Sequence, residues 1–302
     1  MIAFLAPGQG SQTEGMLSPW LELSGAADQL TLWSKASGLD LVRLGTTAST
    51  EEITDTAVTQ PLVVAATLLA HQELTKRGLL AGEEFIAAGH SVGEIAAYAI
   101  AGVMGADDAV ALAATRGAEM AKACALEPTG MSAVLGGDEA EVLARLEQLD
   151  LTPANRNAAG QIVAAGPLAA LEKLAEDPPA KARVRALGVA GAFHTKYMAS
   201  ALDAYAAAAA AIATAEPTAT LLSNRDGKPV TSAAAAMDAL VAQLTQPVRW
   251  DLCTETLREH NVTAIVEFPP AGTLTGIAKR ELRGVPARAV KSPADLDGLT
   301  DL

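Results

Sequence analysis

A serine placed between two glycines, directly after a histidine, is the clearest candidate for chemistry in this chain. The stretch Gly89-His90-Ser91-Val92-Gly93 fits the pattern G-x-S-x-G, in which a tight turn between a strand and a helix exposes a nucleophilic serine. The apolar run before it predicts a strand, and the run after it predicts a helix. A helix N-terminus also supplies N–H groups that favour a developing oxyanion. We therefore interpret Ser91 as a nucleophile, with an ordinary helix-capping serine as the alternative.

A serine hydroxyl is a poor nucleophile without a base, and the chain has four histidines. His90 adjoins Ser91, so its side chain is expected to point away. His71 falls inside a predicted helix, and His260 ends another, where a cation suits the helix dipole. His194 lies on a loop of small residues before a long predicted helix and is the base by elimination. A helix-capping role is its alternative, and either a distant carboxylate or a backbone carbonyl would orient its imidazole.

Arg116 stands alone among apolar residues in the stretch "ALAATRGAEM". An arginine presents a planar fork that matches a carboxylate with two hydrogen bonds. Its position on the helix after the serine turn suggests that it binds a substrate anion. An ion pair with Glu94, Asp107 or Glu119 explains the same residue equally well.

The elements that position these residues predict an α/β protein with a mainly parallel sheet, since short apolar runs alternate with longer helical patterns. A long helix is expected over 59–78, with Pro61 in its first turn. The predicted strands of this sheet are "IAFLAP" at 2–7, "EFIAAG" at 84–89, "ATLLSN" at 219–224, "TAIVEFPP" at 263–270 and "ARAV" at 287–290.

The pattern changes between about residues 130 and 189. There the runs predict strand, helix, two strands, helix and strand, which is the ferredoxin-like βαββαβ unit. We expect this unit to be a small inserted subdomain at 128–189. The large subdomain would then comprise residues 1–127 and 190–302.

Composition restricts the class of protein. The formal charge of −13 argues against a nucleic-acid or anionic-membrane surface. Two cysteines without a CxxC pair indicate neither a disulfide framework nor a zinc site. The turn "GQGSQ" at 8–12 resembles a dinucleotide fingerprint, but Thr13 stands where its third glycine belongs. With neither a signal peptide nor a membrane span expected, we predict a cytoplasmic protein without metal or other cofactor.

Several motifs occur together in one order along the whole chain. They are "PGQGSQ" at 7–12, "GHSVGE" at 89–94, "TRG" at 115–117, "ANRNAAGQIVAAG" at 154–166, "GAFHTKYM" at 191–198, "QLTQPVRW" at 243–250 and "GTLTGIAKR" at 272–280. In this set the chain resembles the malonyl-CoA:acyl carrier protein transacylases of type II fatty-acid synthesis. One departure is "FPPAG" at 268–272, where that family usually has a Gly-Pro-Gly turn.

The resemblance implies roles for the candidate residues. Ser91 would carry the acyl group, His194 would be its base, and Arg116 would bind the malonyl carboxylate. The backbone N–H groups of Gln9 and Val92 would form the oxyanion hole.

Three further positions follow from the same resemblance. The main-chain carbonyl of Gln243 would orient the histidine. Asn155 would line the cleft from the small subdomain. Phe193 would crowd an α-methyl group and so disfavour methylmalonyl.

The implied fold is a hydrolase-like α/β core with a ferredoxin-like insert. The implied activity transfers malonyl from malonyl-CoA to the phosphopantetheine thiol of holo acyl carrier protein, in a monomer with no nucleic-acid or membrane partner. Two basic clusters are candidate carrier-docking sites: Lys181, Arg183 and Arg185, and Lys279, Arg280, Arg283, Arg288 and Lys291. The alternatives are a serine thioesterase or esterase, a patatin-like lipase using Asp226, and a non-catalytic scaffold of the same fold.

Overall fold

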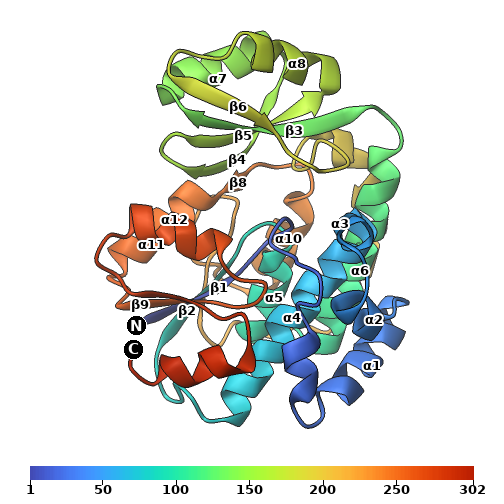
Figure 1. The fold of residues 1–302 in the computed structure, drawn as a ribbon, viewed down its shortest axis with the longest axis vertical. Coiled ribbons are helices and arrows are strands. Elements are labelled where there is room, and N and C mark those ends of the chain that lie inside the picture. Colours follow the sequence, from blue (N-terminus) through green and yellow to red (C-terminus); the bar gives the residue numbers. More distant parts are fainter.

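The computed structural model describes residues 1–302 and contains two β-sheets, one above the other in Figure 1. The strands of the lower sheet are all parallel, in the order β10-β9-β1-β2-β7. They are β1 (Ile2–Ala6), β2 (Phe85–Gly89), β7 (Thr220–Leu221), β9 (Ala264–Glu267) and β10 (Ala287–Ala289). Each lies within one of the five runs predicted from the sequence, and the prediction of a mainly parallel sheet is confirmed.

The upper sheet is mainly antiparallel and has the order β6-β3-β5-β4-β8. Its strands are β3 (Thr129–Gly136), β4 (Thr152–Ala158), β5 (Gln161–Pro167), β6 (Ala182–Ala186) and β8 (Val248–Arg249). Strand β8 was not predicted. It comes from the C-terminal part of the chain and pairs parallel with β4, Asn155 opposite Val248.

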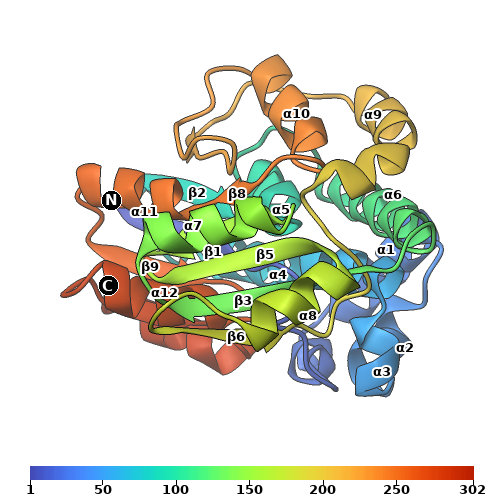
Figure 2. The same cartoon turned by 90° about the horizontal axis from the view of Figure 1, so that it is seen from above.

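Helices cover the sheets and fill the space beside them (Figures 1 and 2). The α-helices are α1 (Ala26–Ser37), α2 (Leu41–Thr46), α3 (Thr50–Thr54), α4 (Thr56–Lys76), α5 (Gly93–Ile100), α6 (Ala106–Cys124), α7 (Glu139–Gln148), α8 (Leu168–Glu176), α9 (Leu202–Ala210), α10 (Ala233–Ala242), α11 (Trp250–Glu259) and α12 (Thr273–Glu281). Three 3₁₀ helices complete the set: η1 (Ser18–Glu22), η2 (Lys196–Ala201) and η3 (Pro293–Leu299).

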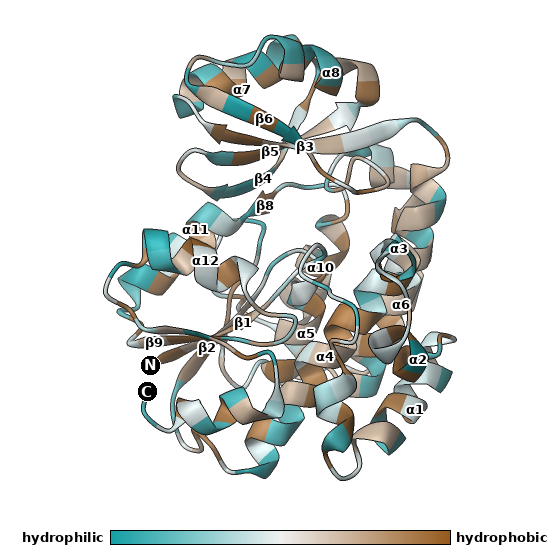
Figure 3. Cartoon of the chain, viewed as in Figure 1, coloured by the Kyte–Doolittle hydropathy of each residue, from teal (hydrophilic) through white to brown (hydrophobic).

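The parallel sheet is buried on both faces, which explains why its strands are continuous apolar runs. Successive side chains of a strand point to opposite faces. In β1, Phe4 joins the core formed with α4, α5 and α6, whereas Ala3 and Leu5 join the core formed with α11 and α12. The brown colour of β1, α4 and α5 in Figure 3 follows this burial.

The long helix α4 begins earlier than its sequence predicted. The side chain of Asp55 caps it by accepting from the N–H of Ala57, so the helix starts at Thr56 and Pro61 lies inside it rather than in its first turn. The capping carboxylate satisfies an N–H group that the helix end would otherwise leave unpaired. This cap decides the start of the helix, and the proline does not.

The upper sheet has one face covered by helices and one face turned toward the lower part of the molecule. Helices α7 and α8 pack on the outer face through a separate small core that includes Val134, Leu146 and Leu171 (Figure 2). Side chains on the opposite face, among them Met131 and Val163, line a cavity between the two sheets. The functional candidates must therefore be sought where β2 ends below this face.

Candidate active site

Ser91 lies on the turn between β2 and α5, at the carboxyl end of the parallel sheet. Its backbone is left-handed, with φ of 54°. A Cβ atom at Gly89 would lie 2.1 Å from the carbonyl carbon of Gly93, and one at Gly93 would lie 2.2 Å from the carbonyl oxygen of Ala6. Both glycines are thus required by close backbone approach. The N-cap of α5 is Val92, so the alternative of a capping serine is wrong.

The structure brings His194 to the serine across more than a hundred residues of chain. Its Nε2 lies 2.8 Å from Ser91 Oγ, and its Nδ1 lies 2.8 Å from the main-chain oxygen of Gln243. The carbonyl can only accept, so Nδ1 carries the proton and Nε2 is left as the acceptor for the serine hydroxyl. This arrangement can deprotonate Ser91.

The environment of His194 keeps its imidazole neutral. The side chain is buried, and burial, followed by the nearby charge of Arg116, lowers the pKa of His194 from 6.5 to about 3. Both causes act against the imidazolium form. A histidine in this state is a base over the whole neutral and mildly acidic range.

The other three histidines have different neighbours. His90 is partly buried beside Trp250, and its Nε2 lies 2.9 Å from Asn157 Oδ1. His71 packs edge-on against Phe4 and Phe268, and burial lowers its pKa to about 4. His260 ends α11. None of these three bonds to Ser91.

Two backbone N–H groups near Ser91 have no acceptor within the protein. They belong to Gln9, on the turn after β1, and Val92, immediately after the serine. Free N–H groups beside a nucleophile are the donors that stabilise a tetrahedral oxyanion.

Arg116 is fully buried on α6 and has no carboxylate partner. Its Nη1 donates to Oε1 of Gln60 at 2.7 Å and its Nη2 donates to Oε1 of Gln243 at 2.8 Å, whereas its Nε has no partner. The ion-pair alternative is therefore wrong. Glu119 pairs with Lys122, Asp107 accepts from Trp33 Nε1, and Glu94 accepts from Asn224 and Gln243.

The reacting pair opens into a cavity of about 260 Å³ between the two sheets. Ser91, His194 and Gln9 line it from below, and Asn155 of β4 and Phe193 line it with them. Arg116 does not line the cavity, because the side chains around it cover its guanidinium. The residues singled out from the sequence thus gather around one site. Gln9, Ser91, Asn155, Phe193 and His194 line the cavity. Gln243 bonds to His194 and Arg116, and Val92 follows Ser91.

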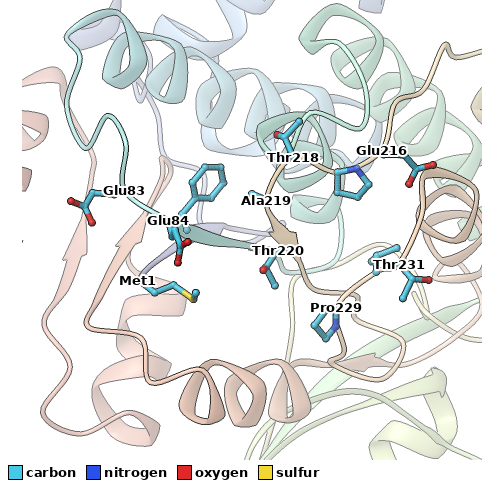
Figure 4. Close-up of a pocket in the computed structure, with 12 residues that line it drawn as sticks. Met1, Glu83, Glu84, Glu216, Thr218, Ala219, Thr220, Pro229 and Thr231 are labelled. Atoms are coloured by element: carbon cyan, nitrogen blue, oxygen red, sulfur yellow. The ribbon is translucent and has the colours of Figure 1, made fainter.

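A larger and more open depression of about 780 Å³ lies at the other end of the parallel strands (Figure 4). Met1, Glu83 and Glu84 line it, just before β1 and β2 begin. Ligands of open parallel sheets bind at the carboxyl ends of the strands, and this depression contains neither serine nor histidine. The smaller cavity at Ser91 is the better candidate.

Sequence reasoning missed the polar groups behind the serine. Gln60, Glu94, Asn224 and the side-chain amide of Gln243 are all buried and hydrogen-bonded to one another or to the catalytic candidates. The available signal was the presence of Gln60 and Glu94 inside otherwise apolar helical runs, where a buried polar group needs a partner.

The structure has no group of three or more His, Cys, Asp or Glu side chains that could hold a metal ion. None of the helices is both long and apolar enough to span a bilayer.

Comparison with known proteins places this chain in a class. It belongs to the acyl transferase domain family, whose pattern matches residues 3–294. Malonyl CoA-acyl carrier protein transacylase of Mycobacterium tuberculosis (strain ATCC 25618 / H37Rv) is 86% identical over 302 residues, covering 100% of both chains. The Escherichia coli (strain K12) protein of that name is 33% identical over 308 residues, covering 100% of this chain and 99% of its relative.

Solved structures agree with these relatives. The crystal structure of MCAT from Mycobacterium tuberculosis has a TM-score of 0.98 and 86% identity, with 99% of each chain covered. A second structure, PlMCAT:AntF (holo), has a TM-score of 0.93 and 31% identity, again with 99% of each chain covered. It is described as a type II PKS acyl-carrier protein in complex with its malonyl-transacylase.

Proposed function

We propose that this chain is a malonyl-CoA:acyl carrier protein S-malonyltransferase, which supplies malonyl units for fatty-acid synthesis. The observation that carries the proposal is the pair of contacts at His194: 2.8 Å to Ser91 Oγ and 2.8 Å to the Gln243 carbonyl. The activity is the one named for its 86% identical relative. The proposal includes a monomeric, cytoplasmic enzyme that needs no metal or other cofactor.

The first half-reaction acylates the serine. His194 Nε2 takes the hydroxyl proton as Ser91 Oγ attacks the thioester carbonyl of malonyl-CoA. The N–H groups of Gln9 and Val92 stabilise the oxyanion of the tetrahedral intermediate. When that intermediate collapses, the carbon–sulfur bond breaks, and His194 returns the proton to the departing CoA thiolate. The product is a malonyl-serine ester.

The second half-reaction is the same sequence in reverse with another thiol. The phosphopantetheine thiol of the carrier gives its proton to His194 and attacks the ester carbonyl. Collapse releases Ser91, which regains the proton, and leaves malonyl on the carrier. The ping-pong order follows because both thiols use the same cavity in turn.

Arg116 supplies the selectivity in this proposal. Its guanidinium is held by two neutral amide oxygens and has an unpartnered Nε, so its charge is available to a substrate carboxylate. A small movement of the covering side chains would admit that carboxylate. Phe193, on the cavity wall, would crowd an α-methyl group, and Asn155 would contact the bound acyl chain from the small subdomain.

The proposal also covers the finer description of the fold. The order β3-α7-β4-β5-α8-β6 is that of a ferredoxin-like unit, and we assign residues 128–189 to a small subdomain. Residues 1–127 and 190–302 would form a hydrolase-like core. The cavity between the sheets supports this division, since substrates commonly bind where two subdomains meet.

Intact mass spectrometry tests the function. The protein is mixed separately with malonyl-CoA, methylmalonyl-CoA and acetyl-CoA, and Ser91→Ala is the control. We expect a malonyl adduct that is weak with the other two thioesters, absent in Ser91→Ala and discharged by holo carrier protein. CoA released steadily into water without transfer would instead indicate a thioesterase. Neither adduct nor turnover would indicate a scaffold.

A further inference from the structure

Glu94 lies directly behind the serine turn, in the first turn of α5, and its carboxyl group is fully buried. One of its oxygens, Oε1, accepts from the backbone N–H of Asn224, and the other, Oε2, accepts from the side-chain amide of Gln243. No positive side chain pairs with it directly. A buried carboxyl group held only by N–H donors is costly to keep in a protein interior, so its place here calls for a function.

Asn224 and Gln243, the two partners of Glu94, hold the backbone of the nucleophile. Asn224 Oδ1 accepts from the N–H of Ser91 at 2.8 Å, and Asn224 Nδ2 donates to the carbonyl of Gly89 at 2.7 Å. Gln243 Nε2 donates to the carbonyl of Ser91 at 3.1 Å. Both polar groups of the strained Ser91 backbone therefore bond to residues that Glu94 holds.

Gln243 also connects Glu94 to the base and to the arginine. Its main-chain oxygen accepts a hydrogen bond from His194 Nδ1, and its side-chain Oε1 accepts a hydrogen bond from Arg116 Nη2. An amide has one oxygen and one NH₂ group, and a guanidinium only donates. The Gln243 oxygen must therefore face Arg116 and its NH₂ group must face Glu94. The acceptor oxygens of Glu94 fix this orientation from the other end.

We propose that Glu94 is a positioning residue for acyl selection. By fixing the Gln243 amide, it ensures that Arg116 is hydrogen-bonded only to neutral amide oxygens, so that the guanidinium charge is available to a substrate carboxylate. The Gln243 amide separates the Glu94 carboxyl group from Arg116, so no ion pair between them competes with the substrate. Burial raises the pKa of Glu94 to about 8, while the Asn224 N–H and the charge of Arg116 oppose that rise. This inference rests on the proposed malonyl transfer.

The substitution Glu94→Gln replaces one acceptor oxygen by an NH₂ group with little change in the shape of the side chain. It therefore tests whether Glu94 fixes the Gln243 amide. Its NH₂ group must face either Gln243 Nε2 or the Asn224 N–H, and both are donors. If it faces Gln243, that amide turns over and presents its NH₂ group to Arg116. A malonyl group then loses more binding than an acetyl group, because only malonyl needs the guanidinium.

The experiment measures kcat/KM for serine acylation with malonyl-CoA and with acetyl-CoA, together with the fraction of protein that acylates. Glu267→Gln is the matched control, since Glu267 is equally buried but accepts from the backbone of Leu274 and Thr275 at the start of α12. For Glu94→Gln we expect the malonyl-to-acetyl ratio to fall about tenfold or more, the loss of one charged hydrogen bond. Glu267→Gln should lower the unfolding temperature and leave the ratio at its wild-type value.

A folded Glu94→Gln protein with the wild-type ratio would overturn the proposal, as would an equal fall of the ratio in Glu267→Gln. If Glu94→Gln yields no folded protein, Glu94→Asp replaces it, because a carboxyl group one methylene shorter cannot reach both partners. The ratio should fall there too, and an unchanged ratio would count against Glu94 in the same way. Wild-type protein that forms no malonyl-serine would instead refute the proposed function itself.

Discussion

Both members of the reacting pair lie in left-handed backbone conformations, with φ of 54° at Ser91 and 60° at His194. Such conformations cost free energy in residues with a side chain and persist where surrounding contacts impose them. At Ser91 those contacts are two hydrogen bonds: the Ser91 N–H donates to Asn224 Oδ1, and Gln243 Nε2 donates to the Ser91 carbonyl. The strain aims Oγ at the imidazole, so the site is formed before a substrate arrives.

Removing the guanidinium of Arg116 should change which acyl group is used. In Arg116→Ala we expect kcat/KM for malonyl-CoA to fall about 10- to 100-fold relative to acetyl-CoA, the worth of a charge-assisted hydrogen bond. Acylation rates with the two thioesters measure this ratio. Arg145→Ala, which removes a partly exposed arginine from α7, is the control and should keep the wild-type preference.

The low pKa of His194 predicts an unusual pH profile. Its folded value of about 3 lies below the ordinary 6.5, so the imidazole stays neutral and able to accept a proton as pH falls through 6.5. We expect kcat/KM for acylation by malonyl-CoA to show no drop centred near pH 6.5 between about pH 8 and about pH 5. In Arg116→Ala the pKa should rise, which would move the acid limb to higher pH. A wild-type profile that halves near pH 6.5 would contradict this environment.

The reacting residues could be located from the sequence, but the buried residues that hold them in place could not. Ser91 and His194 were recognisable because a nucleophile turn has a local pattern and the chain has few histidines. The Glu94–Gln243–Asn224 contacts join residues up to 149 positions apart, and their geometry depends on tertiary packing. A side-chain amide that joins a buried carboxyl group to a guanidinium has no local sequence pattern.

The turn between β2 and α5 is the element on which the site depends. Gly93 is packed so closely that its substitution by alanine forces a carbon to 2.2 Å from the oxygen of Ala6. We expect Gly93→Ala to lower the free energy of unfolding by about 1–3 kcal/mol or more, as overpacking does. Urea unfolding measures it, with acylation lost in parallel.

Gly276 in α12 is the control for that substitution. Nothing lies within 4 Å of a Cβ atom built there, and alanine is the better helix former by about 1 kcal/mol. Gly276→Ala should therefore be neutral or stabilising. If Gly93→Ala proved as neutral or stabilising as Gly276→Ala, close backbone approach would not be what requires glycine at position 93.

Elements with a strong periodic pattern were predictable, and those formed by tertiary pairing were not. The strands of the parallel sheet fall within short apolar runs of sequence, and α7 and α8 have one apolar face each. Strand β8 has two residues, too few for any period, and exists because β4 lies beside it. The start of α4 was missed because the cap of Asp55 was not weighed against the more conspicuous Pro61.

At the scale of the whole molecule, the acidic net charge restricts where an acidic carrier protein could dock. The chain carries a formal charge of −13, so an acidic carrier protein needs a local basic surface. The exposed side chains of Lys181, Arg183 and Arg185 lie on or beside β6, an edge strand of the upper sheet. We infer that they guide the carrier, and the second cluster near the C-terminus is the alternative.

Charge reversal tests this surface. Replacing Lys181, Arg183 and Arg185 by glutamate should raise KM for the carrier severalfold at low salt and leave KM for malonyl-CoA unchanged. Steady-state transfer at varied carrier concentration measures both. The same reversal at Lys279, Arg283 and Arg288 provides the comparison, and whichever cluster leaves carrier kinetics unaltered has no part in docking.

Strand β8 has a consequence for building chimeras. It follows Gln243 by only four residues and pairs with β4, the strand that carries Asn155. The segment that orients the base is thus attached at one end to the core and at the other to the upper sheet. Exchanging residues 128–189 between relatives to alter acyl preference would replace β4 but not β8. The new β4 would then have to pair with a β8 from a different protein. A functional graft should carry residues 243–250 along with residues 128–189.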